Sequence, residues 1–80
     1  MNSISDRLIR CFLLVFPNLS PDEIPAAAAR DLNEWDSLAH VNLLSVICEE
    51  FGIDIDFAEF GDATSFSALL DRLRELTAHS

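Results

Sequence analysis

The sequence predicts an all-α protein, a four-helix bundle with three long helices, one short third helix and a long loop between the first two. Apolar residues recur at three- and four-residue steps in three separate segments, which is the spacing of a helical face. The alternating stretch Ile53–Asp56 is too short for a sheet strand and has no partner elsewhere in the sequence. Eighty residues, half of them apolar, are expected to fold as a single domain spanning residues 1–80.

The first helix is expected from Ser3 to about Phe16. Ser3 can cap its start, and Asp6 places a negative charge in the first turn, where it suits the helix dipole. Pro17 ends the helix. The apolar residues that share its predicted face are Ile4, Leu8, Cys11, Phe12 and Val15.

Residues 17–36 form a connection that is long for a compact domain, and long ordered loops often carry function. It contains all three prolines and the alanine run 26–29. Ser20 and Glu23 have the spacing of a capping box with Pro21 at the first helical position, although Pro25 stops the turn almost at once.

The second long helix is expected to start at Asp36 or Ser37 and to run to Phe51, with Gly52 as its C-cap. Its predicted apolar face comprises Leu38, Val41, Leu44, Ile47, Cys48 and Phe51. Residues 56–59 then have the spacing of a single capped turn that Gly61 closes. The last helix begins near Thr64 or Ser65, and its apolar stripe comprises Phe66, Leu69, Leu70, Leu73 and Leu76.

Fourteen acidic residues stand against five Arg and no Lys, which gives a formal net charge of −9. This balance disfavours binding to nucleic acid or to an anionic membrane and favours partners with basic surfaces.

Cys11 and Cys48 lie in apolar runs and are predicted to be buried thiols, with a disulfide between them as the alternative. The apolar run 11–16 is too short for a signal core or a membrane span, so we expect a cytoplasmic protein, and the like charge favours a monomer.

The tripeptide Asp36–Ser37–Leu38 lies where the long loop meets the second long helix. Unpaired backbone amides and the positive end of the helix dipole make such a position suitable for a phosphate ester. A serine there is also accessible to a modifying enzyme. The alternative interpretation is that Asp36 is only an N-cap and Ser37 an ordinary first-turn residue.

The tripeptide is followed by a consistent set of residues: Val41, Leu43, Ile47, Glu49, Glu50, Phe51, Ile53 and Ile55. With this set, the chain resembles an acyl carrier protein. The resemblance is close from Leu32 to Leu73, and the outer segments agree with the family in helix order and length. It implies that Ser37 carries a 4′-phosphopantetheine group, whose thiol holds acyl or aminoacyl groups as thioesters in a biosynthetic pathway such as fatty acid or polyketide synthesis.

The resemblance also implies partners and excludes catalysis by this chain, which would be a substrate of other enzymes. A Mg²⁺-dependent phosphopantetheinyl transferase would attach the arm, a ligase would load it with acyl or aminoacyl groups, and acyltransferases or synthases with basic docking patches would use it. The residues expected to flank the arm or to meet partners are Asp36, Leu38, Val41, Glu49, Glu50, Asp54 and Asp56.

Ala39 and Asn42 stand where fatty-acid carriers commonly have acidic residues, with His40 between them. Cys48 replaces a frequent Glu, and Trp35 precedes the motif where a smaller residue is common. These departures favour a specialised carrier over the housekeeping fatty-acid carrier. Trp35 is expected to be either a lid over the site or a core residue, and His40 to face solvent or partners.

Two alternatives from other classes are a small helical docking module and a hydrolase that uses Ser37 and His40, which lie three residues apart on one helical face. The hydrolase lacks an orienting third group, and a chain of this length has little room for a substrate cleft. The acidic residues Asp54, Asp56, Glu59 and Asp62 lack the ligand order of a calcium loop, so we expect a solvated acidic face and no metal site.

Overall fold

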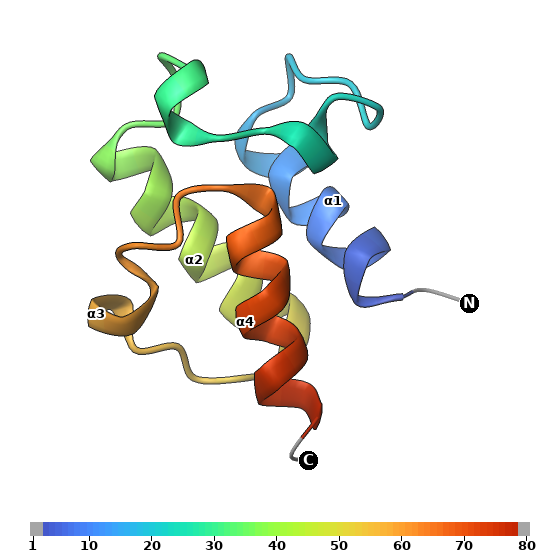
Figure 1. Ribbon diagram of the computed structural model, residues 1–80, viewed down its shortest axis with the longest axis vertical. Helices are drawn as coiled ribbons and strands as arrows, with labels where there is room; N and C mark the ends of the chain where they lie inside the picture. The colour runs from blue at the N-terminus through green and yellow to red at the C-terminus, as the bar shows by residue number, and fades with distance from the viewer. Residues whose placement is uncertain (1–2, 79–80) are drawn as a thin grey trace.

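The computed structural model describes residues 3–78, which form an all-α protein with four α-helices (Figure 1). Their bounds are α1 Ile4–Val15, α2 Ser37–Phe51, α3 Phe57–Phe60 and α4 Phe66–Ala78. Two short 3₁₀ helices, η1 (Ile24–Ala26) and η2 (Ala29–Asp31), lie in the connection between α1 and α2. The order and approximate limits of the predicted helices are therefore confirmed.

The helix ends follow the capping residues of the sequence. Ser3 Oγ accepts a hydrogen bond of 3.1 Å from the Asp6 amide at the start of α1, and Asp36 Oδ1 accepts one of 2.9 Å from the Ala39 amide at the start of α2. Gly52 ends α2 in the left-handed conformation, with φ 63° and ψ 37°, which is costly for residues with a Cβ. Ser65 Oγ accepts from the Ala68 amide at 3.2 Å at the start of α4.

The core lies where α1 packs against α2 and α4. Its centre is aromatic: the Phe12 ring is 5.3 Å from Trp35 and 5.4 Å from Phe66 between centroids, with edge-on geometry in both pairs. Such pairs add to the stabilisation from area burial. The other completely or almost completely buried side chains include Leu8, Ile24, Leu43, Leu44, Ile47, Leu69 and Leu73.

The predicted apolar face of α2 is only partly right. Leu44 and Ile47 are buried, but Leu38 is 71% exposed and Val41 is 44% exposed, while Leu43, which the predicted face omits, is completely buried. Apolar residues surround most of this helix, so the positions of α1 and α4 decide which of them are covered. Leu38 and Val41 are thereby left on the surface beside Ser37.

The connection between α1 and α2 is ordered by contacts with the start of α4. Ile24 is completely buried, and η1 packs against both α1 and α4. The Ala29 amide donates to Thr64 O at 2.8 Å, and the Phe66 amide donates to Ala27 O at 3.0 Å. Figure 1 shows this connection crossing one end of the helices, which fixes the segment that leads into Ser37.

Arg7 joins the start of α1 to the end of α2. Its Nε donates to Glu50 Oε2 at 2.9 Å, its Nη2 donates to Glu50 O, and its guanidinium lies 4.3 Å from the centre of the Phe51 ring. Phe51, which belongs to the predicted apolar face of α2, is half-buried beneath this guanidinium. The contact stabilises the end of α2 opposite Ser37.

Both cysteines are free thiols, and Cys11 is buried as expected. Cys48 differs from the expectation because it is only half-buried. Burial, together with a smaller contribution from the nearby Glu50 carboxylate, raises the pKa of the Cys11 thiol to about 11. None of the helices formed by residues 3–78 combines the length and the apolar character needed to cross a bilayer.

Candidate functional site

Ser37 is the first residue of α2, and its side chain is exposed. In the first backbone hydrogen bond of α2, the His40 amide donates to Asp36 O at 2.9 Å. The Ala39 amide donates to the side-chain oxygen Asp36 Oδ1. The amides of Ser37 and Leu38 come before these two donors in the chain, and they belong to the unpaired donors of a helix N-terminus. An anionic group attached to Ser37 would therefore be stabilised by these donors and by the helix dipole.

A groove of about 530 Å³ opens beside Ser37 between the start of α2 and α3. Its volume falls within the usual range of small-ligand pockets, and its lining is mainly apolar. The residues that line it are Ala29, Trp35, Asp36, Ser37, His40, Val41, Leu44, Phe57, Gly61 and Thr64. No pattern in the sequence indicates the contribution of Phe57, Gly61 and Thr64, because these residues reach the groove only through the placement of α3 and the turn after it.

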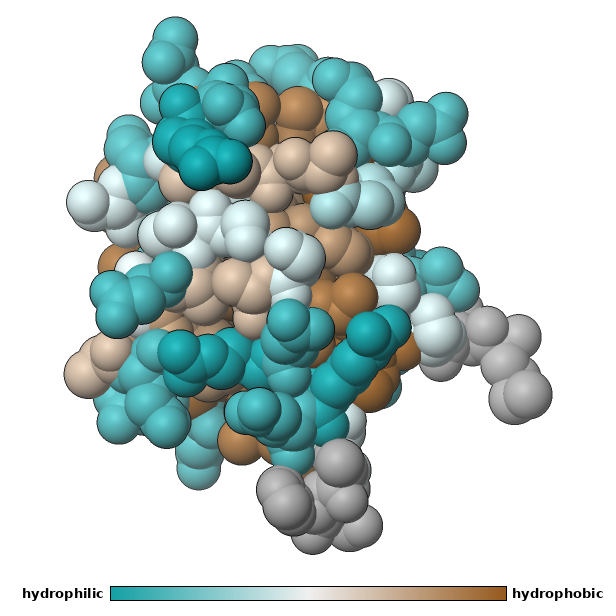
Figure 2. Space-filling view, viewed as in Figure 1, coloured by the Kyte–Doolittle hydropathy of each residue, from teal (hydrophilic) through white to brown (hydrophobic). Residues whose placement is uncertain are grey.

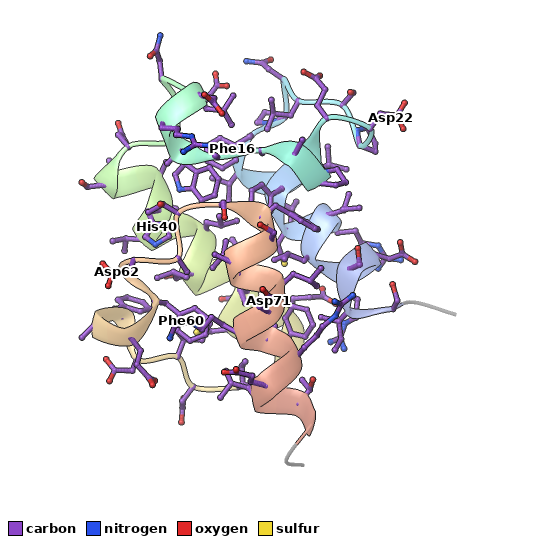
Figure 3. All side chains as sticks on the ribbon, viewed as in Figure 1. Phe16, Asp22, His40, Phe60, Asp62 and Asp71 are labelled. Carbon is purple, nitrogen blue, oxygen red and sulfur yellow. The ribbon has the colours of Figure 1, made fainter. Side chains whose placement is uncertain are left out.

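Trp35 and His40 form one wall of this groove and are hydrogen-bonded to each other. The Trp35 Nε1–H donates to His40 Nδ1 at 3.1 Å, and His40 Nε2 lies 3.0 Å from Phe60 O, the carbonyl at the end of α3. Because Nδ1 accepts, the tautomer that satisfies both contacts carries its proton on Nε2. Figure 3 shows His40 on α2, facing the segment that contains α3 and the turn after it.

These contacts decide between the two expectations for Trp35. The indole is only 4% exposed and lies 5.3 Å from Phe12 and 5.7 Å from Phe16 between ring centroids, so it is a core residue whose polar edge reaches the groove. His40, expected to face solvent or partners, is instead half-buried and braces α3. Sequence spacing could not reveal this, because the acceptor is a backbone carbonyl twenty residues away.

The same contacts disfavour a catalytic pair formed by Ser37 and His40. A general base needs a nitrogen lone pair within hydrogen-bond reach of the serine hydroxyl. His40 Nδ1 accepts from Trp35, and Nε2 carries a proton toward Phe60 O. Neither ring nitrogen is free to take a proton from Ser37 in this arrangement.

The acidic residues expected to meet partners differ in their exposure and in their contacts within the chain. Glu49 is exposed, but Glu50 is half-buried and bound to Arg7. Asp54 is exposed, and Asp56 caps α3 by accepting from the Ala58 amide at 2.9 Å. The exposed side of α2 carries Ser37, Leu38, Val41, Asn42, Ser45 and Glu49, so Glu49 is its one charged residue.

The acidic residues Asp54, Asp56, Glu59 and Asp62 are all exposed, in agreement with the expected solvated face. Figure 3 shows Asp62 pointing outward beside α3. On the face shown in Figure 2, hydrophilic residues gather toward the two ends of the molecule, and apolar or weakly polar residues cross the middle. In the part of the chain that the structure describes, no three His, Cys, Asp or Glu side chains are grouped closely enough to hold a metal ion.

The site thus consists of an exposed serine at a helix start and an adjoining, mostly apolar groove with a hydrogen-bonded wall. Compared with models of protein families, with curated proteins and with solved structures, the chain matches none. Its function is therefore inferred from this site and from the residues around Ser37.

Proposed function

We propose that this chain carries acyl or aminoacyl groups as thioesters on a 4′-phosphopantetheine arm attached to Ser37, and delivers them to the enzymes of a biosynthetic pathway. The observation that carries the proposal is the position of Ser37, an exposed first residue of α2 on the rim of an apolar groove. The resemblance of residues 32–73 to acyl carrier proteins supports the same serine.

The surroundings of Ser37 fit the arm. The arm supplies a terminal thiol that forms the thioester, and its phosphodiester would lie at the α2 N-terminus, where the amides of Ser37 and Leu38 precede the first helical hydrogen bond. Within residues 3–78, His40 does not activate the Ser37 hydroxyl, because both of its ring nitrogens have other partners. Attachment would therefore depend on a separate phosphopantetheinyl transferase, and the chain would act as a substrate.

The finer architecture belongs to the same proposal. The packing of α1 against α2 and α4, with α3 beside α2, supports a four-helix bundle of the carrier type with a long first loop. The interior formed by the buried residues Leu44, Ile47, Phe66 and Leu69 would part to admit a portion of a bound acyl chain. Ile55 is half-buried and packs against this interior.

Partner enzymes would approach the exposed side of α2 near Ser37. Leu38 and Val41 are exposed there, and Phe57 on α3 is 45% exposed across the groove. Glu49, Asp54 and the other surface carboxylates would attract the basic patches of a loading ligase, an acyltransferase or a synthase, mainly by raising the association rate. The sparse charge on α2 supports a specialised carrier over the housekeeping one. The same proposal places the chain in the cytoplasm, and its net charge of −9 favours a monomer.

The proposal is tested by transfer of the arm. The purified protein is incubated with coenzyme A, Mg²⁺ and a broad-specificity phosphopantetheinyl transferase, and its intact mass is measured. We expect a gain of one phosphopantetheine unit in the wild type and in Ser45→Ala, a variant of another exposed serine on α2. No gain in the wild type, or the same gain in Ser37→Ala, would overturn the proposal.

A further inference from the structure

We infer that His40 holds α3 against α2 and thereby limits the length of acyl chain that the groove beside Ser37 accepts. The limit on cargo rests on the proposed carrier function, whereas the hold on α3 does not depend on it. The inference starts from two hydrogen bonds, which join the imidazole of α2 to Trp35 on one side and to Phe60 O on the other.

The α3 helix has few attachments of its own. It is a single turn of four residues, and its internal hydrogen bonds are local: Asp56 caps it, and the Phe60 amide donates back to Asp56 O at 3.0 Å. It packs against α2, and the buried Phe60 side chain anchors its last residue. The His40 bond to Phe60 O adds a direct polar link between this turn and α2.

The separation of α2 and α3 sets the size of the groove. His40, Val41 and Leu44 line it from α2, while Phe57 and Gly61 line it from α3 and the residue after it. Leu44 is 1% exposed, so the floor of the groove is already the core. A longer apolar chain could extend past this floor only if α3 moved outward, and that movement would break the bond from His40 to Phe60 O.

Trp35 keeps the imidazole in place from the inside. Its ring is packed against Phe12 and Phe16, and its Nε1–H has His40 Nδ1 as acceptor. Turning His40 away from α3 would leave this buried donor without a partner, which is unfavourable. His40 is therefore a positioning residue with a preferred orientation and not a freely rotating surface side chain.

Two substitutions separate the links. In His40→Asn the amide reaches the position of Nδ1, so the contact with Trp35 can be kept while the contact with Phe60 O is lost. In His40→Gln the longer side chain places its amide nitrogen near the position of Nε2, so the contact with Phe60 O can be kept. Both variants lose the imidazole ring, and each keeps one of its two hydrogen bonds. His40→Gln therefore serves as the matched control for His40→Asn.

The hold on α3 is measured by amide hydrogen exchange of the unmodified protein, read at Phe60 and Ala63, with Leu43 in α2 as the reference amide. We expect exchange at Phe60 and Ala63 to be roughly threefold to tenfold faster in His40→Asn, the effect of losing one hydrogen bond, and unchanged in His40→Gln. Equal acceleration in both variants, or none in His40→Asn, would overturn the inference. Should His40→Asn not fold, the test passes to His40→Leu, which keeps apolar bulk but loses the hydrogen bond to Phe60 O; faster exchange at Phe60 supports the link to α3, and unchanged exchange contradicts it.

The limit on cargo is measured by loading each protein with butanoyl-, octanoyl- and dodecanoyl-phosphopantetheine from the corresponding acyl coenzyme A and recording melting temperatures. In the wild type and His40→Gln, the melting temperature should rise with the butanoyl group and should not rise further with the octanoyl and dodecanoyl groups. In His40→Asn, the longer chains should add roughly 4–8 °C as they enter the core. The same chain-length profile in all three proteins would contradict a limiting role for His40, whereas failure of any loading would count against the carrier function and leave the exchange result standing.

Discussion

Raising the pH from 9 to 11 should destabilise the folded protein through a single side chain, Cys11. The chain contains no Lys and no Tyr, and its carboxylates are already ionised in this range. Arginine keeps its charge and the α-amino group titrates near pH 8. Cys11 is a buried thiol, so the alkaline effect on stability is expected from this side chain.

The magnitude follows from the pKa of this thiol. Burial, reinforced by the Glu50 carboxylate and partly offset by Arg7, raises the pKa of Cys11 from 9.0 to about 11. In the unfolded chain the thiol loses its proton first, so the unfolded state is favoured as the pH rises between these values. The free energy of unfolding should be nearly constant well below pH 9 and should fall by roughly 2–3 kcal/mol as the pH rises through 11.

The assay is urea unfolding followed by Trp35 fluorescence at several pH values between 8.5 and 11.5, with a reducing agent present throughout. Cys48→Ala should show the same alkaline fall as the wild type. Cys11→Ala should be less stable at every pH because it leaves a small cavity, but its stability should not fall over this range. The reasoning is refuted if the wild type shows no fall, or if Cys11→Ala shows an equal one.

Other substitutions test the packing and the helix ends. Phe12→Ala should lower the free energy of unfolding by about 3–5 kcal/mol in urea titrations, while Leu14→Ala, at a residue 74% exposed, should change it by less than about 0.5 kcal/mol. Arg7→Met should cost about 1 kcal/mol at low salt and less at 1 M salt, because its partner Glu50 is only partly shielded from water; equal costs at both would contradict an ionic contribution. Gly52→Ala should lower the free energy of unfolding by about 1 kcal/mol, and the melting temperature with it, through backbone strain alone, since a Cβ there would meet no atom within 4 Å; an unchanged melting temperature would contradict this.

Local signals in the sequence were enough to predict the helices. Asp36 and Gly52 mark both ends of α2 through side-chain and backbone chemistry that acts over a few residues. Ser20 and Glu23 form the expected capping contact, in which Glu23 Oε1 accepts from the Ser20 amide at 3.1 Å and from Ser20 Oγ at 2.9 Å. These bonds lower the pKa of Glu23.

Contacts between distant segments could not be predicted in the same way. The link from Trp35 through His40 to Phe60 O joins three segments, and its last acceptor is a backbone atom that any residue would supply. Likewise, the pairing of Glu50 with Arg7 depends on how α1 crosses the end of α2. Arg7 lies forty-three residues from Glu50 in the sequence, so the pairing could not be predicted. From the sequence alone, Glu50 is therefore expected to be a surface charge that meets partners.

The position of the arm is the central claim, and mapping it on the modified protein tests it most directly. After treatment with coenzyme A and a phosphopantetheinyl transferase, tryptic cleavage yields the peptide 31–72, which contains four serines, Ser37, Ser45, Ser65 and Ser67. Tandem mass spectrometry of this peptide should place one phosphopantetheine group on Ser37 and leave the other three unmodified. A group on any other serine, or an unmodified peptide under conditions that load a known carrier protein to completion, would contradict the account.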